Sequence, residues 1–283
     1  MPAHPASGQA SEVSLGSRYD RLHRSRIAYD DPLLVLCVDM MGSTDFSSSD
    51  TTWKWRPVGD GFHAQLAGTI SNARELTSQL HAQLLESKPE GVREVLETLR
   101  LGFGNYKHAF AEGYIQNRLG MSYANFLETG KESLPADLFR ELSRDIADHD
   151  SEAQIIVSGF LNSRPVIFTV TGESVASCDD FAVIGSGSQL AEAALYHRDQ
   201  SFMNGINRTI YCVYEAKRLA EKAPGVGRRT QMFVFRPDGS MAIIPDQGLR
   251  LLDTWFTRFG PQPIIPEVFP EEFLTRQPAP RQI

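Results

Sequence analysis

One glycine- and serine-rich stretch suggests chemistry on first inspection. Residues 182–195, AVIGSGSQLAEAAL, pass from an apolar run through two glycines and two serines into a helical pattern. A phosphate-binding P-loop would need a lysine here, and a dinucleotide fingerprint would need a third glycine where Leu190 or Ala191 stands. A local explanation is that Ser186 caps a helix and Gln189 completes a capping box. Phosphate or small-molecule binding at the 185–188 turn stays open as an alternative.

Other common catalytic patterns are absent from the sequence. No Gly-x-Ser-x-Gly elbow occurs beyond GSGSQ, and the histidines are scattered. Only His63 lies near the proposed cleft, and we interpret it as a strand residue that is either solvated or hydrogen-bonded. The three cysteines, Cys37, Cys178 and Cys212, lie apart among apolar residues, which indicates buried thiols rather than disulfides or a zinc site. We therefore expect no metal and no cofactor.

Composition limits the partners of the chain. The 283 residues carry a net charge of -7, which argues against general nucleic-acid binding because phosphate contacts need clustered lysine and arginine. No apolar run is long enough to cross a membrane, and the first residues lack the apolar core of a secretory signal. We expect a cytosolic protein that binds neither nucleic acid nor membranes.

Hydrophobic patterning predicts strands and helices in consecutive groups. Residues 1–24 are expected to be a disordered leader, and a hairpin turning at Asp30-Asp31-Pro32 leads into a fully buried strand, 33–38. A second hairpin turns at Gly59-Asp60-Gly61. A helix follows over 70–84, and its apolar residues recur every three or four positions.

The second half of the chain repeats this grouping. Residues 90–146 are predicted to form broken helices, followed by three strands, two helices and a hairpin turning at Pro237-Asp238-Gly239. The proline-containing segment 251–283 is expected to be an arm lying on a surface. Grouped strands and grouped helices are typical of an α+β fold with antiparallel sheets.

Taken together, several motifs resemble the β-type subunits of the proteasome and their bacterial relatives of the HslV and Anbu kind. The motifs are LLVLCVD ending in Asp39, WKW with Lys54, AQLAGT with Gly68, and FAVIGSGSQLAEA with Ser186. Their order matches the family, as does the separation of 14 residues between Lys54 and Gly68. The loop and strand APGVGRRTQMFVF extend the likeness, which covers about residues 25–245.

The resemblance implies a fold and an assembly. The fold would be a four-layer αββα sandwich, that of the N-terminal-nucleophile (Ntn) hydrolases, over residues 25–250, with a helical insertion at about 104–150. The chain would form a homo-oligomer, either a ring or a dimer. A peptide or protein would be its substrate.

The resemblance also implies roles for single residues. Lys54 would tune the nucleophile, Asp39 would pair with Lys54, and the backbone N–H at Gly68 would form the oxyanion hole. Ser186 would lie beside the active site. The alternative for Asp39 and Lys54 is a structural ion pair between strands, or two unrelated surface charges.

The nucleophile is where the sequence departs from the family. The family's spacing, counted back from Asp39, reaches His23, which cannot serve as the nucleophile. Ser25 is the best substitute, with cleavage after Arg24. The family's arginine two residues after the aspartate is Met41 here, and the aspartate of its rear loop falls at Ala223.

These departures favour one hypothesis over another. The preferred one is a pseudoenzyme, a structural subunit that has lost most or all peptidase activity. The alternative is a self-processing peptidase or amidase that uses Ser25.

Overall fold

The structure is a computed structural model, and its description covers most of the chain. The described residues are 12–16, 32–43, 48–49, 52–172 and 174–261. Ser25 and the strand predicted before Asp30 lie outside them.

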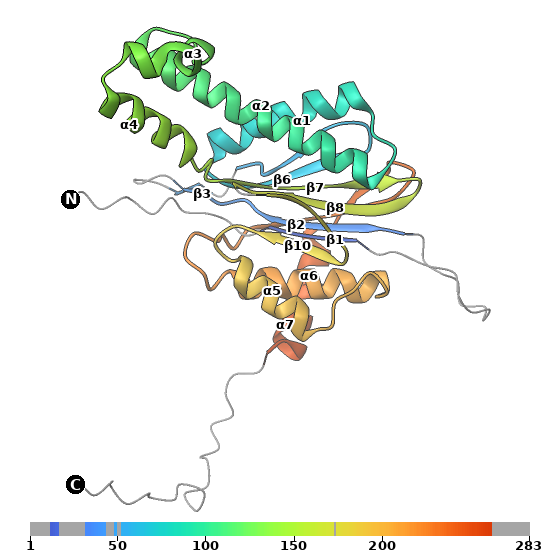
Figure 1. Cartoon of the computed structure of the whole chain (residues 1–283). Coiled ribbons are helices and arrows are strands. Elements are labelled where there is room, and N and C mark those ends of the chain that lie inside the picture. Colours follow the sequence, from blue (N-terminus) through green and yellow to red (C-terminus); the bar gives the residue numbers. More distant parts are fainter. Residues whose placement is uncertain (1–11, 17–31, 44–47, 50–51, 173, 262–283) are drawn as a thin grey trace, which may run out of the picture.

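The described elements stack in four layers (Figure 1). Helices α1 to α4 lie on the outer side of one sheet, and helices α5 to α7 lie on the outer side of the other. The two sheets face each other across a shared apolar layer. The predicted grouping of strands and helices into an α+β fold agrees with this arrangement.

Sheet 1 has the strand order β10-β1-β2-β11-β12, and all its pairs are antiparallel. Its strands are β1 (Glu12–Gly16), β2 (Leu34–Asp39), β10 (Phe181–Ile184), β11 (Thr230–Phe235) and β12 (Met241–Ile243). Every residue of β2 is buried, as the apolar run predicts. The turn at Pro237-Asp238-Gly239 joins β11 to β12, also as predicted.

Strand β1 corrects the prediction of a disordered leader over residues 1–24. Glu12–Gly16 lies inside sheet 1, paired with β10 on one side and β2 on the other. The prediction is wrong for these five residues because the short segment EVSLG has little local strand signal. Its strand conformation is set by backbone pairing with two neighbours that are distant in sequence.

Sheet 2 has the order β5-β6-β7-β8-β9 and is also antiparallel. Its strands are β5 (Trp55–Pro57), β6 (Phe62–Gly68), β7 (Ala153–Leu161), β8 (Arg164–Val170) and β9 (Val175–Cys178). The predicted hairpin through Gly59-Asp60-Gly61 is confirmed as β5 and β6. Two short strands, β3 (Gly42–Ser43) and β4 (Ser48–Ser49), pair separately.

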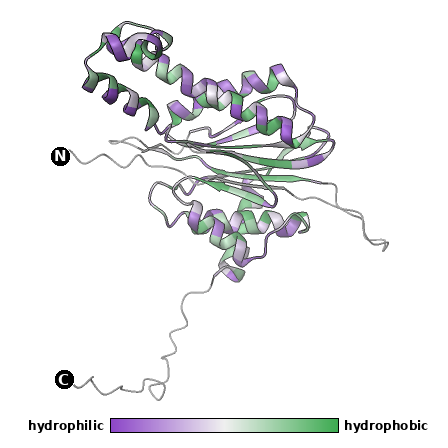
Figure 2. Ribbon diagram, viewed as in Figure 1, coloured by the Kyte–Doolittle hydropathy of each residue, from purple (hydrophilic) through white to green (hydrophobic). Residues whose placement is uncertain are grey.

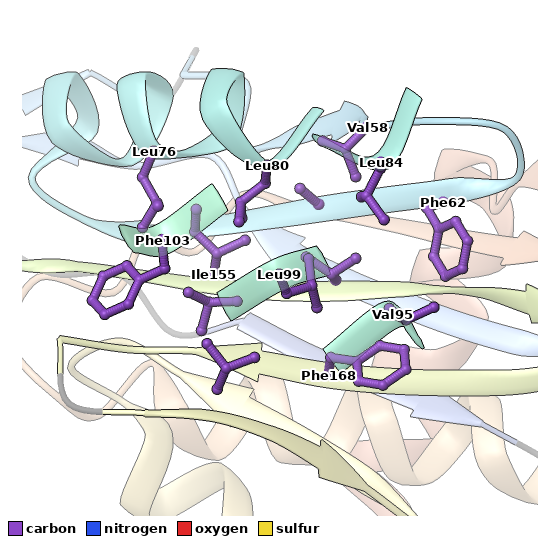
Figure 3. Close-up of a cluster of buried hydrophobic side chains, with 14 of the residues drawn as sticks. Val58, Phe62, Leu76, Leu80, Leu84, Val95, Leu99, Phe103, Ile155 and Phe168 are labelled. Atoms are coloured by element: carbon purple, nitrogen blue, oxygen red, sulfur yellow. The ribbon is translucent and has the colours of Figure 1, made fainter. Parts of the chain in front are cut away.

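Helices α1 (Ile70–Ser87) and α2 (Val92–Leu119) cover sheet 2. Figure 3 shows their apolar side chains meeting those of the sheet, with Leu76 and Leu80 of α1 and Leu99 of α2 close to Ile155 and Phe168. In Figure 2 the strands of the two sheets are mostly hydrophobic, whereas hydrophobic and hydrophilic residues alternate along the outer helices. The predicted helix at 70–84 is confirmed.

The predicted broken helices at 90–146 are confirmed as α2, α3 (Tyr123–Ser133) and α4 (Ala136–Ala147). Helices α3 and α4 pack against the end of α2 through a small core of their own around Phe126 and Leu142. In Figure 1 they project beyond the sheets. A short connection leads from α4 back to the start of β7.

Helices α5 (Ser188–His197), α6 (Ile206–Ala220) and α7 (Asp246–Phe259) cover sheet 1. The prediction of an irregular arm from residue 251 onward is wrong as far as Phe259. Leu249, Leu252 and Phe256 give α7 an apolar face that packs on the core, a periodicity that the prolines further along obscured. Among the described residues, no helix combines the length and apolar character needed to cross a membrane.

Candidate functional site

Several strand ends meet at one edge of the sandwich. Within sheet 1, the first residue of β1, Glu12, pairs with Val38 and with Ile184. In sheet 2, Gly68 ends β6 and pairs with Ala153 at the start of β7. This edge therefore collects Asp39 and Gly68, the last residues of β2 and β6, and Ser186, which follows β10.

A hydrogen bond joins the two sheets at this edge. Gln154, the second residue of β7, accepts a hydrogen bond from the backbone N–H of Gly185 through its Oε1, at 2.7 Å. Gly185 directly precedes Ser186. The turn after β10 is thereby held against sheet 2.

Asp39 and Lys54 form a buried ion pair. The Nζ of Lys54 lies 2.7 Å from Oδ1 of Asp39, and the two side chains are 2% and 0% exposed. Lys54 is positioned because its carbonyl accepts a hydrogen bond from Leu66 N–H on β6. The pair connects the end of β2 in sheet 1 to the segment entering β5 in sheet 2. It is thus a link between sheets, and the two residues are not unrelated surface charges.

The second oxygen of Asp39 holds the loop after α6. Its Oδ2 accepts a hydrogen bond from Gly227 N–H at 2.7 Å. The Gly227 carbonyl in turn accepts from Nζ of Lys217 at 2.7 Å, and Lys217 is 2.5 Å from Oε1 of Glu221. Lys217 is only 1% exposed. One buried polar network therefore connects Lys54, Asp39, the Gly227 peptide and the end of α6.

Burial and charge act on Asp39 in opposite directions. Desolvation raises the pKa of its carboxyl above the ordinary value, while Lys54, the Gly227 amide and Lys217 lower it. Desolvation is the largest influence, so the pKa stays above its ordinary value although both oxygens have partners, and an unpaired carboxylate buried here would cost still more.

Gly68 has a structural reason to be glycine. Its φ is +86°, and a Cβ built on it would lie 1.9 Å from the carbonyl oxygen of Glu152. The next residue, Thr69, donates its N–H to that same carbonyl. The close approach of β6 to the segment before β7 is therefore enough to require glycine at position 68. An oxyanion hole is not needed to explain this residue.

The turn containing Ser186 differs from the predicted capping box. Helix α5 begins at Ser188, its N-cap residue is Gly187, and no side chain caps it. Gly185 has a φ of +89°, and its carbonyl accepts a hydrogen bond from Ser188 N–H. The prediction that Ser186 caps the helix and Gln189 completes the box is therefore wrong. Ser186 is exposed at the candidate site instead.

The same geometry argues against phosphate binding at residues 185–188. Gln154 engages the N–H of Gly185, and the Gly185 carbonyl engages the N–H of Ser188. A phosphate would need such amides to point outward. The turn is built to join two sheets.

His63 lies in the layer between the sheets, away from Asp39. Its ring is 4.1 Å from that of Phe235 and 5.4 Å from that of Trp55, measured between centroids. Burial lowers its pKa to about 4, so the ring is neutral near pH 7. His63 lies on strand β6, as predicted, but the expectation that it is solvated or hydrogen-bonded is wrong for its Nδ1, which is buried without a hydrogen-bond partner in the described structure.

Sequence reasoning missed three residues of this site, Gln154, Lys217 and Gly227. In the sequence, Lys217 looks like an ordinary solvent-exposed lysine on a helix. Its partner, the Gly227 carbonyl, is brought to it only by the fold. Within the described part of the chain, no three histidine, cysteine, aspartate or glutamate residues cluster as metal ligands would.

Comparison with known proteins adds no assignment. No protein-family model matches the chain, and no curated protein matches it significantly. The functional interpretation therefore depends on the site and the fold themselves.

Proposed function

We propose that this protein is a proteasome-subunit-like member of the Ntn-hydrolase fold that acts as a structural, oligomer-forming subunit with little or no peptidase activity. The observation that carries the proposal is the ion pair between Asp39 and Lys54, buried at the edge where the strand ends of an αββα stack meet. The motifs that resemble the family supplied both residues before the fold was known.

The surroundings of the ion pair favour a structural role over catalysis. Where the resemblance calls for an aspartate in the rear loop, Ala223 packs in the apolar cluster under α6, and the nearby Val226 is buried. Lys54 and Asp39 join two sheets and the Gly227 loop. These links stabilise the fold even when no nucleophile is present.

Peptidase assays on the purified full chain test the proposal. We expect no hydrolysis of a fluorogenic peptide panel above that of a Lys54→Met, Asp39→Leu variant, and no labelling by an epoxyketone or β-lactone probe. We also expect light scattering to report an oligomer. Hydrolysis that disappears in the double variant while the oligomer persists would overturn the pseudoenzyme interpretation.

A second candidate is a self-processing hydrolase, and one observation argues against Ser25 as its nucleophile. Cleavage after Arg24 would separate Glu12–Gly16, a central strand of sheet 1, from the rest of the chain. A nucleophile placed before β1 avoids this problem. Ser11 directly precedes Glu12 in the sequence, and Glu12 pairs with Val38, the neighbour of Asp39.

Intact mass and N-terminal sequencing separate these possibilities. A chain beginning at Ser11 that becomes full length in Ser11→Ala would establish self-processing ahead of β1. A chain beginning at Ser25 would restore the original alternative, with Ser25→Ala as its control. A chain that retains the residues before Ser11 supports the structural role.

A further inference from the structure

Helix α7 carries a second apolar stripe that is largely exposed, although the ring of Trp255 also lies 6.5 Å from that of Tyr211, measured between centroids. Leu251, Trp255 and Phe259 follow one another at intervals of four residues and are 50%, 37% and 54% exposed. Side chains four apart lie along one line of a helix. Scattered exposed apolar residues are normal, but an aligned row of large ones indicates a contact surface.

The stripe is basic at one end. Arg258 lies over the ring of Phe259, 5.0 Å from its centroid. Arg198 donates to the carbonyl of Phe259 at 2.8 Å, and Arg208 donates to the carbonyl of Arg198. Glu215 forms an ion pair with Arg198 at 2.6 Å, and the side chains of Arg208 and Arg258 are exposed. The surface therefore fits a partner that is both apolar and acidic.

The chain itself contains a segment of that chemistry directly after the helix. Residues 264–274, IIPEVFPEEFL, contain six large apolar residues, three glutamates and no lysine or arginine. We call them the acidic segment. They lie outside the described residues, and only four residues, 260–263, separate them from Phe259.

We propose that the stripe formed by Leu251, Trp255 and Phe259 is the docking surface for the acidic segment of the same chain. The stripe spans eight residues of helix, or about 12 Å at 1.5 Å per residue. An extended chain covers about 3.3 Å per residue, so about four residues of the segment span the stripe. Glu267, the glutamate of the segment that is nearest to Phe259 along the chain, would face the arginines there. This inference does not rest on the proposed function, because α7 belongs to the outer helix layer.

Quenching of Trp255 by acrylamide tests the proposal in the full chain. The difference between the chain and its Trp255→Phe variant isolates the emission of Trp255. Replacing Glu267, Glu271 and Glu272 together by lysine should release the segment. We expect the quenching constant of Trp255 to rise about two-fold or more.

The matched control makes the same charge change elsewhere. Glu128, Glu132 and Glu141 lie exposed on α3 and α4, and replacing all three by lysine should leave the quenching of Trp255 unchanged. Replacing Arg208 and Arg258 by glutamate should also release the segment. Combining this change with the three-lysine segment should restore protection, because the charges are then exchanged.

Three outcomes would overturn the proposal. Equal quenching in the chain and its three-lysine variant would show that the segment does not cover Trp255. If the control variant also loses the protection of Trp255 from acrylamide, the change in quenching is caused by net charge and not by release of the segment. Protection that disappears on dilution would show that a second copy is the occupant, in place of the same chain.

Discussion

The layer between the two sheets has two unlike polar regions. At the edge with Asp39, each charged group has a partner, from Lys54 through the Gly227 peptide to Lys217 and Glu221. Around His63 the polar atoms are neutral. His63 Nδ1, Trp55 Nε1 and Ser158 Oγ are buried without a hydrogen-bond partner among the described residues.

The comparison shows two ways in which polar groups are buried in this protein. Charges are tolerated where they are paired and hydrogen-bonded, since removing one partner leaves an uncompensated charge in a medium of low polarity. Neutral polar atoms without partners each cost less, and aromatic packing between Trp55, His63 and Phe235 offsets part of that cost. The ion-pair network is therefore expected to be the more sensitive to mutation.

Removing one charge should give the largest effect. Lys54→Met leaves Asp39 buried without its ammonium partner, and we expect the free energy of unfolding to fall by about 3–5 kcal/mol. Urea denaturation measures the change. When Lys54→Met is combined with Asp39→Leu, the free energy of unfolding should fall by much less than the sum of the decreases in the two single variants. Additive losses would show that the pair is not coupled.

Removing the more distant lysine should give a smaller loss. Lys217→Met leaves the Gly227 carbonyl without its donor, at a cost of about 1–3 kcal/mol. Lys217→Arg retains a donor and should recover part of the loss. If Lys217→Met were as stable as the parent chain in urea, the network would end at Asp39.

Acid should destabilise the His63 region, in addition to its effect on the carboxylates. The folded-state pKa of His63 is about 4, below its ordinary 6.5, so the unfolded chain binds the proton more readily. The stability contributed by neutral His63 is complete above pH 6.5 and is lost as the pH falls towards 4. The melting temperature of His63→Phe should therefore fall less than that of the parent over this window. Equal slopes would contradict the prediction.

The smallest effect is expected at Ser158. Its hydroxyl is fully buried and lacks a partner in the described structure, so Ser158→Ala removes a desolvated group without leaving another unpaired. We expect a change within about 1 kcal/mol, neutral or stabilising. A loss comparable to that of Lys217→Met would show that Ser158 has a partner, such as a buried water.

Local signals and long-range contacts explain which parts could be predicted. The strand 33–38, the hairpin at Gly59-Asp60-Gly61 and the helix at 70–84 follow from apolar periodicity and turn residues, which are local. Asp39 and Lys54 were found through resemblance to a family, and the structure brings them into contact. Both belong to motifs with a recognisable order along the chain.

The missed features depend on partners distant in sequence. Strand β1 is a strand because β2 and β10 flank it. Lys217 is buried because the Gly227 loop folds back over α6. The capping box predicted at Ser186 fails because the turn is pulled towards Gln154 on the other sheet. None of these contacts has a local pattern.

The strand order of sheet 1 has a consequence for biosynthesis. Its strands come from residues 12–16, 34–39, 181–184, 230–235 and 241–243, whereas sheet 2 is complete by residue 178. The N-terminal part of a nascent chain leaves the ribosome first. Sheet 2 and its helices can therefore assemble while β1 and β2 still lack their partners β10 and β11. Non-local pairing is slow, and unpaired strand edges promote aggregation. The two earliest strands therefore gain their remaining partners only after residue 180 has been synthesised, and chaperones have most reason to bind before then.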